Sequence, residues 1–148
     1  HWLLESIEAL VPRSGVSESS YVRHLVETLF SLTASGGVVI VGRGGAQILP
    51  QATTLRVRVT APLEKRVAEL AQQLNLSPRD AKRELTDCDR RRVDFVKEHF
   101  HKDPTDATNY DLTLNTAWLN VDACAGLILQ ALSARQEALA HRPDKAAT

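Results

Sequence analysis

Val38-Val39-Ile40-Val41-Gly42-Arg43-Gly44-Gly45 is the stretch of this sequence that decides the expected fold. Its four consecutive β-branched residues are typical of a strand covered on both faces, as in a parallel α/β sheet. Such sheets bind ligands just beyond the carboxyl ends of their strands, and glycines there let a ligand approach the backbone closely. We therefore predict a strand over 38–42 that places Gly42, Arg43 and Gly44 at a substrate-binding edge.

Arg43 at such an edge suits a phosphate or a carboxylate, because a guanidinium group holds either one with two parallel hydrogen bonds. The alternative is an ordinary turn between strand and helix with a solvated arginine, since most arginines are exposed. This segment by itself favours neither interpretation.

The length is that of one domain, because a chain of 148 residues buries roughly two thirds of its unfolded surface on folding. Eighteen basic and eighteen acidic residues cancel, which argues against a general nucleic-acid-binding protein. Cys88 and Cys124 lie far apart without metal-type spacing, so we expect reduced thiols in a cytoplasmic protein. No apolar run approaches the ~20 residues of a membrane span, and nothing at His1 resembles a signal peptide.

Strands alternate with helices along the chain, which predicts a βαβ-type layered domain. Two more strands are expected, over 54–60, where apolar and polar residues alternate, and over 110–115. Caps and apolar periodicity predict the helices. These are expected over 2–11, from Ser17 to about 34, over 46–49, 62–74 and 77–100, and from Asn120 to a polar tail that begins near Ala140.

The 77–100 helix carries a dense group of charges, namely Asp87, Asp89, Arg90, Arg91, Arg92, Asp94 and Lys97. Successive arginines cannot share one helix face, because neighbouring residues are separated by about 100°. One interpretation is an exposed, salt-bridged helix in which Asp87 pairs with Arg91. The other is a movable segment that closes over transferring phosphates, where guanidinium groups neutralise the charge on phosphoryl oxygens.

Other candidate groups give weaker signals, and we assign no metal ligand. His99 and His101 are two residues apart, a spacing that diverges on a helix, so a frayed helix end is expected there. Asp103, Asp106 and Asp111 lie among turn residues, where carboxylates usually cap or are solvated; holding Mg²⁺ through water is the alternative. No Gly-x-Ser-x-Gly and no Gly-x-x-x-x-Gly-Lys-Ser/Thr segment occurs.

Four segments together resemble the cytidylate kinase-like family, in its order and approximate spacing. They are 38–49 (VVIVGRGGAQIL), 55–66 (LRVRVTAPLEKR), Asp89-Arg90-Arg91-Arg92-x-x-Phe95 and 109–116 (NYDLTLNT), and Ser19-x-Tyr21-Val22-Arg23 also fits. The resemblance covers about residues 17–133. It implies a P-loop-kinase-like fold, with a parallel sheet layered by helices on both faces in a three-layer α/β/α arrangement, within a single domain over 1–148.

The same resemblance implies an activity, the transfer of the γ-phosphate of ATP to CMP or a similar nucleotide with Mg²⁺. By motif position, Arg43 would bind the phosphate of the nucleoside monophosphate. Arg90 and Arg92 would belong to a mobile lid that contacts the phosphates during transfer, with Asp89 orienting them.

One departure from the family concerns its Gly-rich phosphate loop, which family members carry upstream of the matched segments and which this chain lacks. The start at His1 and the lack of methionine suggest a chain cut from a longer one. In the family fold, the strand before that loop lies between the equivalents of 38–42 and 54–60. We therefore expect unpaired strand edges, a sheet completed by a partner chain or a second copy, and no phosphate transfer by this chain alone.

Two functions from different classes remain open on the sequence. One is a phosphotransferase of which this chain is the C-terminal part. The other is a non-catalytic module of the same fold that binds a nucleotide or phosphate. A kinase for a different acceptor is a third, because these motifs do not name the residues that read the base.

Overall fold

A computed structural model describes residues 17–141, which form two compact units that we describe separately. Residues 17–54 and 83–109 belong to the first unit, and residues 55–82 and 110–141 to the second. The helix expected over 2–11 lies outside the described residues, as does the part of the expected polar tail beyond 141.

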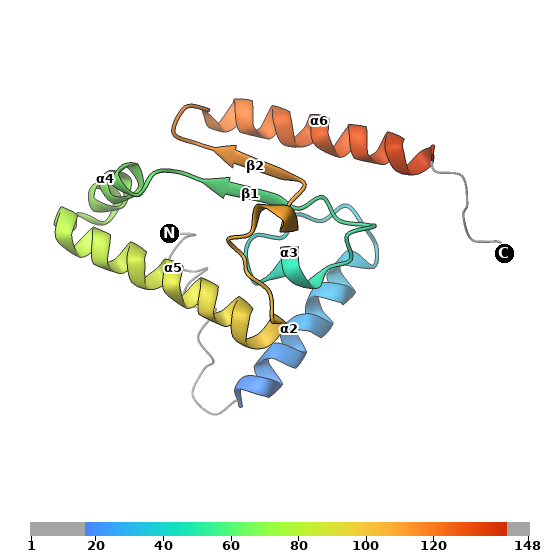
Figure 1. Cartoon of the computed structure of the whole chain (residues 1–148), viewed down its shortest axis with the longest axis horizontal. Coiled ribbons are helices and arrows are strands. Elements are labelled where there is room, and N and C mark those ends of the chain that lie inside the picture. The colour runs from blue at the N-terminus through green and yellow to red at the C-terminus, as the bar shows by residue number, and fades with distance from the viewer. Residues whose placement is uncertain (1–16, 142–148) are drawn as a thin grey trace. The chain divides into compact units, whose positions relative to one another are not determined.

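The first unit is mainly helical (Figure 1). Its elements are α2 (Glu18–Thr33), the short α3 (Gly45–Ile48), most of α5 (Pro78–Phe100) and a 3-10 turn, η1 (Ala107–Asn109). The expected start of α2 is confirmed, because the Ser17 side chain accepts a hydrogen bond from the Ser20 N–H at 3.3 Å. The apolar stripe of α2 is only partly covered: Leu29 is buried, whereas Phe30 is exposed.

The second unit is built on a two-stranded parallel sheet, with α6 running alongside β2 (Figure 1). Its elements are β1 (Val57–Thr60), α4 (Leu63–Leu74), β2 (Leu112–Asn115) and α6 (Val121–Ala140). In the sheet, Val57 lies opposite Leu112 and Val59 lies opposite Leu114. Both strands are shorter than the sequence predicts, but both lie within the expected ranges.

The strand expected over 38–42 is not formed, and its predicted burial is wrong. Residues 38–41 take part in no strand pairing among the described residues, and Val39 and Val41 are 91% and 62% exposed. A strand exists only where a neighbouring strand exchanges backbone hydrogen bonds with it. The described residues of the first unit contain no strand with which 38–42 could pair. The fold is therefore mixed, with helices and a small parallel sheet, compatible with an α/β kinase-like class; the three-layer arrangement stays a prediction.

The long charged helix is confirmed from Pro78 to Phe100. Its start is capped by Ser77, whose hydroxyl accepts from the Asp80 N–H at 3.1 Å and donates to the Asp80 carboxylate at 2.6 Å. Cys88 and Cys124 are buried thiols outside any disulfide. Between residues 17 and 141, no helix combines the length and the apolar character that a membrane crossing needs.

Asn120 tests the capping of α6. Its side-chain oxygen accepts a hydrogen bond from the Ala123 N–H at 2.8 Å. We expect Asn120→Ala to lower the free energy of unfolding by about 1 kcal/mol, measured by urea denaturation followed by circular dichroism. Asn120→Asp keeps an accepting oxygen and is the matched control; an equal loss in both variants would contradict the capping role.

Candidate functional site

Residues 42–45 form a tight turn in which φ is positive at Gly42, Arg43 and Gly44, at 73°, 57° and 68°. The Gly45 N–H donates to the Gly42 carbonyl at 3.0 Å, so Arg43 and Gly44 occupy the central positions, as in a type I′ turn. Glycine adopts this conformation readily, but a left-handed arginine costs roughly 1–2 kcal/mol. Backbone strain of this kind gathers at ligand sites, which makes Arg43 a candidate binding residue on conformational grounds.

The glycines of the turn have different surroundings. A Cβ atom on Gly44 would lie 2.8 Å from Cε2 of Phe100, the last residue of α5, whereas a Cβ on Gly42 would meet no atom within 4 Å. Gly44 is also the N-cap of α3, and its carbonyl accepts from the N–H groups of Gln47 and Ile48 at 2.9 and 3.0 Å. Gly44 is thus required by packing, while the Gly42 side of the turn is open.

The Arg43 side chain is half-buried, and its Nη1 donates a hydrogen bond to the Tyr21 hydroxyl at 3.2 Å. Tyr21 lies in the first turn of α2. Its sequence signal is limited to its place in a segment that resembles the family, which gives it no role by itself. The buried strand expected before Arg43 is not formed. The 42–45 turn and the hydrogen bond to Tyr21 position Arg43 instead.

Arg91 of α5 does not pair with Asp87 as expected, and Arg90 pairs with Asp87 instead. Arg90 Nη2 lies 2.9 Å from Asp87 Oδ1, and Arg91 Nη2 lies 3.6 Å from Glu84 Oε1. The expected pair of Asp87 with Arg91 is therefore wrong. Arg91 follows Glu84 by seven residues, about two helical turns, and shares its face, whereas Arg90 follows Asp87 by three residues, about one turn.

Arg92 belongs to the same helix, and its Nη2 lies 3.9 Å from Asp89 Oδ1 and donates to the buried Cys88 sulfur at 3.1 Å. The side chains of Arg90 and Arg92 are 69% and 48% exposed. Exposed ion pairs contribute about 1 kcal/mol or less, so either guanidinium group can leave its carboxylate for a more strongly charged anion. The geometry fits a solvated helix and a phosphate-binding segment equally well.

The loop carboxylates after α5 stabilise turns, as the sequence predicts. Asp103 Oδ1 accepts from the N–H and the hydroxyl of Thr105 at 2.8 and 2.7 Å. Asp106 Oδ1 accepts likewise from Thr108 at 2.9 and 2.7 Å. The Thr108 hydroxyl, and then its N–H, lower the pKa of Asp106 below its ordinary value. Both oxygens therefore stabilise turns of the loop and are not arranged as magnesium ligands.

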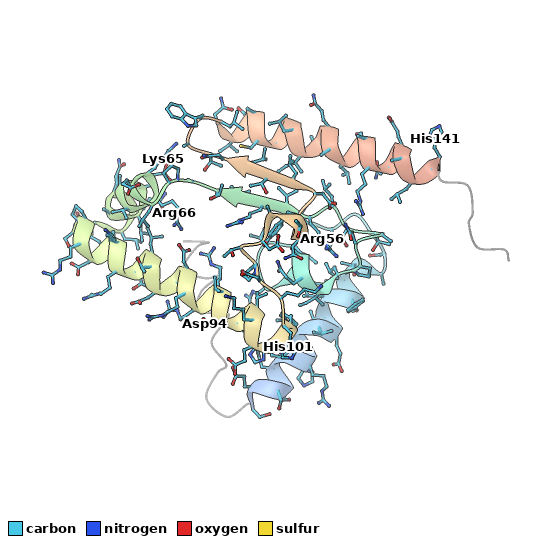
Figure 2. The ribbon with its side chains drawn as sticks, viewed as in Figure 1. Arg56, Lys65, Arg66, Asp94, His101 and His141 are labelled. Atoms are coloured by element: carbon cyan, nitrogen blue, oxygen red, sulfur yellow. The ribbon has the colours of Figure 1, made fainter. Side chains whose placement is uncertain are left out.

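In the second unit, charged side chains form hydrogen bonds between segments next to the ends of β1 and β2. Asp111 Oδ2 accepts from the Arg56 N–H at 2.8 Å, just before β1. Lys65, in the first turn of α4, donates to the carbonyl oxygens of Thr116 and Ala117 at 2.9 and 3.2 Å, just after β2. Figure 2 labels Arg56 and Lys65 at these places. Asp111 therefore has a structural role here.

The chain is similar to known proteins over most of its length. The model of the cytidylate kinase-like family matches residues 3–117. A cytidylate kinase of Methanopyrus kandleri is 27% identical over 106 residues, covering 66% of this chain and 55% of that protein. A protein named uronate isomerase, from Corynebacterium glutamicum, is 29% identical over 115 residues, covering 77% of this chain and 22% of that protein. The chain thus spans about half or less of these curated relatives.

Gly44→Ala tests the packing of the turn against α5. We expect it to lower the free energy of unfolding by about 1–3 kcal/mol more than a control substitution, because the new methyl group overlaps the Phe100 ring. Gly36→Ala is the matched control, since Gly36 has nearly the same φ of 69° but open space around its Cβ position. Equal losses in chemical denaturation would show that only backbone strain matters at Gly44.

Proposed function

Because this chain belongs to the cytidylate kinase-like family, we propose that it forms the acceptor-binding part of a nucleoside monophosphate kinase. The protein would transfer the γ-phosphate of ATP to CMP or a related nucleotide. The observation that carries the proposal is the family match over residues 3–117, which includes both the 42–45 turn and the arginines of α5. The similarity to a protein named cytidylate kinase supports it.

Arg43 binds the phosphate of the acceptor nucleotide in this proposal. Its planar guanidinium group presents a fork of donors that matches two phosphate oxygens. The hydrogen bond from Nη1 to the Tyr21 hydroxyl orients that group. The left-handed backbone of Arg43 is the kind of strain that persists where function requires it.

Arg90 and Arg92 act as the lid arginines in this proposal, with Asp89 beside Arg92 as its orienting carboxylate. Their exposed carboxylate partners hold them loosely in the absence of nucleotide. A nucleotide with several phosphate charges competes for them, because it offers more negative charge and more acceptor oxygens than one exposed carboxylate. Guanidinium groups placed there stabilise the charge that develops on the transferring phosphoryl oxygens.

ATP and Mg²⁺ are the donor and the metal that the family implies, and Mg²⁺ would neutralise charge on the donor phosphates. The oxygens of Asp103 and Asp106 that accept from threonines already serve turns, so we assign neither residue to Mg²⁺. The sequence of residues 1–148 contains no Gly-x-x-x-x-Gly-Lys-Ser/Thr segment to hold the donor. The residues assigned here therefore act on the acceptor and on the phosphate in transfer. The two buried free thiols agree with a reducing compartment, and we propose a cytoplasmic protein.

Arg43→Ala tests the acceptor site. We expect this substitution to weaken CMP binding by roughly 2–4 kcal/mol, the scale of a lost charge-assisted pair, measured by titration calorimetry. Arg43→Lys should recover only part of the loss, because an ammonium group cannot reproduce the fork.

Arg23→Ala is the control for Arg43, since Arg23 is an exposed arginine of α2 in a long pair with Glu27 at 4.0 Å. It should leave CMP affinity unchanged. Unchanged affinity in Arg43→Ala would remove Arg43 from the acceptor site and with it the proposed role of the 42–45 turn.

Arg90→Ala and Arg92→Ala test the lid in the full-length protein with ATP, Mg²⁺ and CMP. Each should lower kcat by about 100-fold while changing nucleotide affinity less, because the interactions form mainly in the transition state. Arg91→Ala should have the smallest effect, since Arg91 faces Glu84. Small and equal effects at all three positions would favour a solvated helix on a non-catalytic nucleotide-binding module.

A further inference from the structure

Three potential metal ligands converge where α2 begins and α5 ends. They are Glu18, in the first turn of α2, and Glu98 and His99, in the last turn of α5. One ligand atom of each residue lies within 4.8 Å of the ligand atoms of the other two. In the described part of the chain, no other group of three or more histidine, cysteine, aspartate or glutamate residues comes this close together. Glu18 and His99 are 81 positions apart, so the fold and not the local sequence brings them together.

The His99 imidazole is held in place. Its side chain is only 14% exposed, and its Nε2 lies 3.1 Å from Glu18 Oε1. The ring packs edge-on against Phe95, with the centroids 4.8 Å apart, and lies 6.4 Å from Phe100 at a similar angle. A ring fixed in this way loses little conformational freedom when Nε2 binds a cation.

The chemistry and spacing of these atoms fit a divalent transition ion. Zinc binds imidazole nitrogen and carboxylate oxygen at about 2.0–2.2 Å, so two ligands at a tetrahedral angle lie about 3.3–3.6 Å apart. Nε2 and Oε1 lie 3.1 Å apart, so a small shift of the exposed Glu18 side chain would bring them to that geometry. An imidazole with carboxylates suits Zn²⁺ and similar ions, whereas Mg²⁺ prefers oxygen ligands alone.

We propose that Glu18, Glu98 and His99 bind one divalent transition ion of the Zn²⁺ class, which links the N-terminal turn of α2 to the C-terminal turn of α5. With neutral imidazole the two carboxylates carry two negative charges, which a divalent ion neutralises. Three protein ligands leave a fourth position of the ion to water.

The simpler explanation is an ordinary ion pair between Glu18 and His99. Glu98 distinguishes the two, because such a pair does not need it, whereas a three-ligand site does. His24 and Glu27 provide an internal comparison: His24 Nδ1 lies 3.4 Å from Glu27 Oε2 on the exposed side of α2. That pair has the same residue types but belongs to no group of three ligands among residues 17–141.

The test is calorimetric titration of the purified, untagged, metal-free protein with ZnCl₂. We expect one Zn²⁺ per chain, and at least about tenfold weaker binding in Glu98→Gln and in His99→Ala. His24→Ala is the matched control and should bind like the unmodified protein. Because His99→Ala also removes a packed ring, the exposed substitution Glu98→Gln decides the result.

Thermal unfolding provides a second measurement, since an ion that binds only the folded state raises Tm. Zn²⁺ should raise Tm in the unmodified protein and equally in His24→Ala, but by less in Glu98→Gln. Mg²⁺ at the same concentration should have no effect on any of them. The proposal is overturned if Glu98→Gln binds Zn²⁺ like the unmodified protein, if His24→Ala loses the binding, or if no binding is detected.

Discussion

The close approach of Gly44 to Phe100 is the contact on which the first unit depends. A Cβ atom at position 44 would lie 2.8 Å from the Phe100 ring, closer than side-chain atoms approach one another. The turn that carries Arg43 is thereby packed against the end of the helix that carries Arg90 and Arg92. A larger residue at position 44 would fill this space and displace both the turn and the helix, because packed interiors transmit changes in shape.

The two proposed phosphate-binding elements differ in how firmly they are held. Arg43 has a left-handed backbone that the turn and its neighbours impose, and its side chain is hydrogen-bonded to Tyr21. Arg90 and Arg92 lie in exposed pairs on the surface of a regular helix. A pre-positioned group suits the binding of an acceptor, and loosely held groups suit a segment that must move during each turnover.

The last turn of α5 contacts two neighbours at once. Phe100 packs on the turn at Gly44, and His99, one residue earlier, faces Glu18 of α2. The end of this helix is ordered by those contacts and is not the frayed end that the spacing of His99 and His101 suggested. His101 itself follows the helix with a positive φ of 52°, as helix-terminating residues often have, and Figure 2 labels it there.

The sequence by itself determined the features that depend on neighbouring residues. The caps at Ser17, Ser77 and Asn120, and the helices that follow them, were predicted correctly because a cap is a hydrogen bond across three residues. The turn at 42–45 agrees with one of the two interpretations of the segment around Arg43, and its glycines adopt positive φ readily. The charged pattern of α5 indicated ion pairs, although the pair it predicted, Asp87 with Arg91, is wrong.

Only the tertiary structure decided the features that need a partner far along the chain. The apolar run at 38–41 has the composition of a buried strand, yet without a neighbouring strand among the described residues it forms none. The contact of Arg43 with Tyr21 and that of His99 with Glu18 join residues 22 and 81 positions apart, so no local spacing could reveal them. Strand pairing and side-chain clusters arise from the folded chain, because their stability depends on groups that the local sequence does not contain.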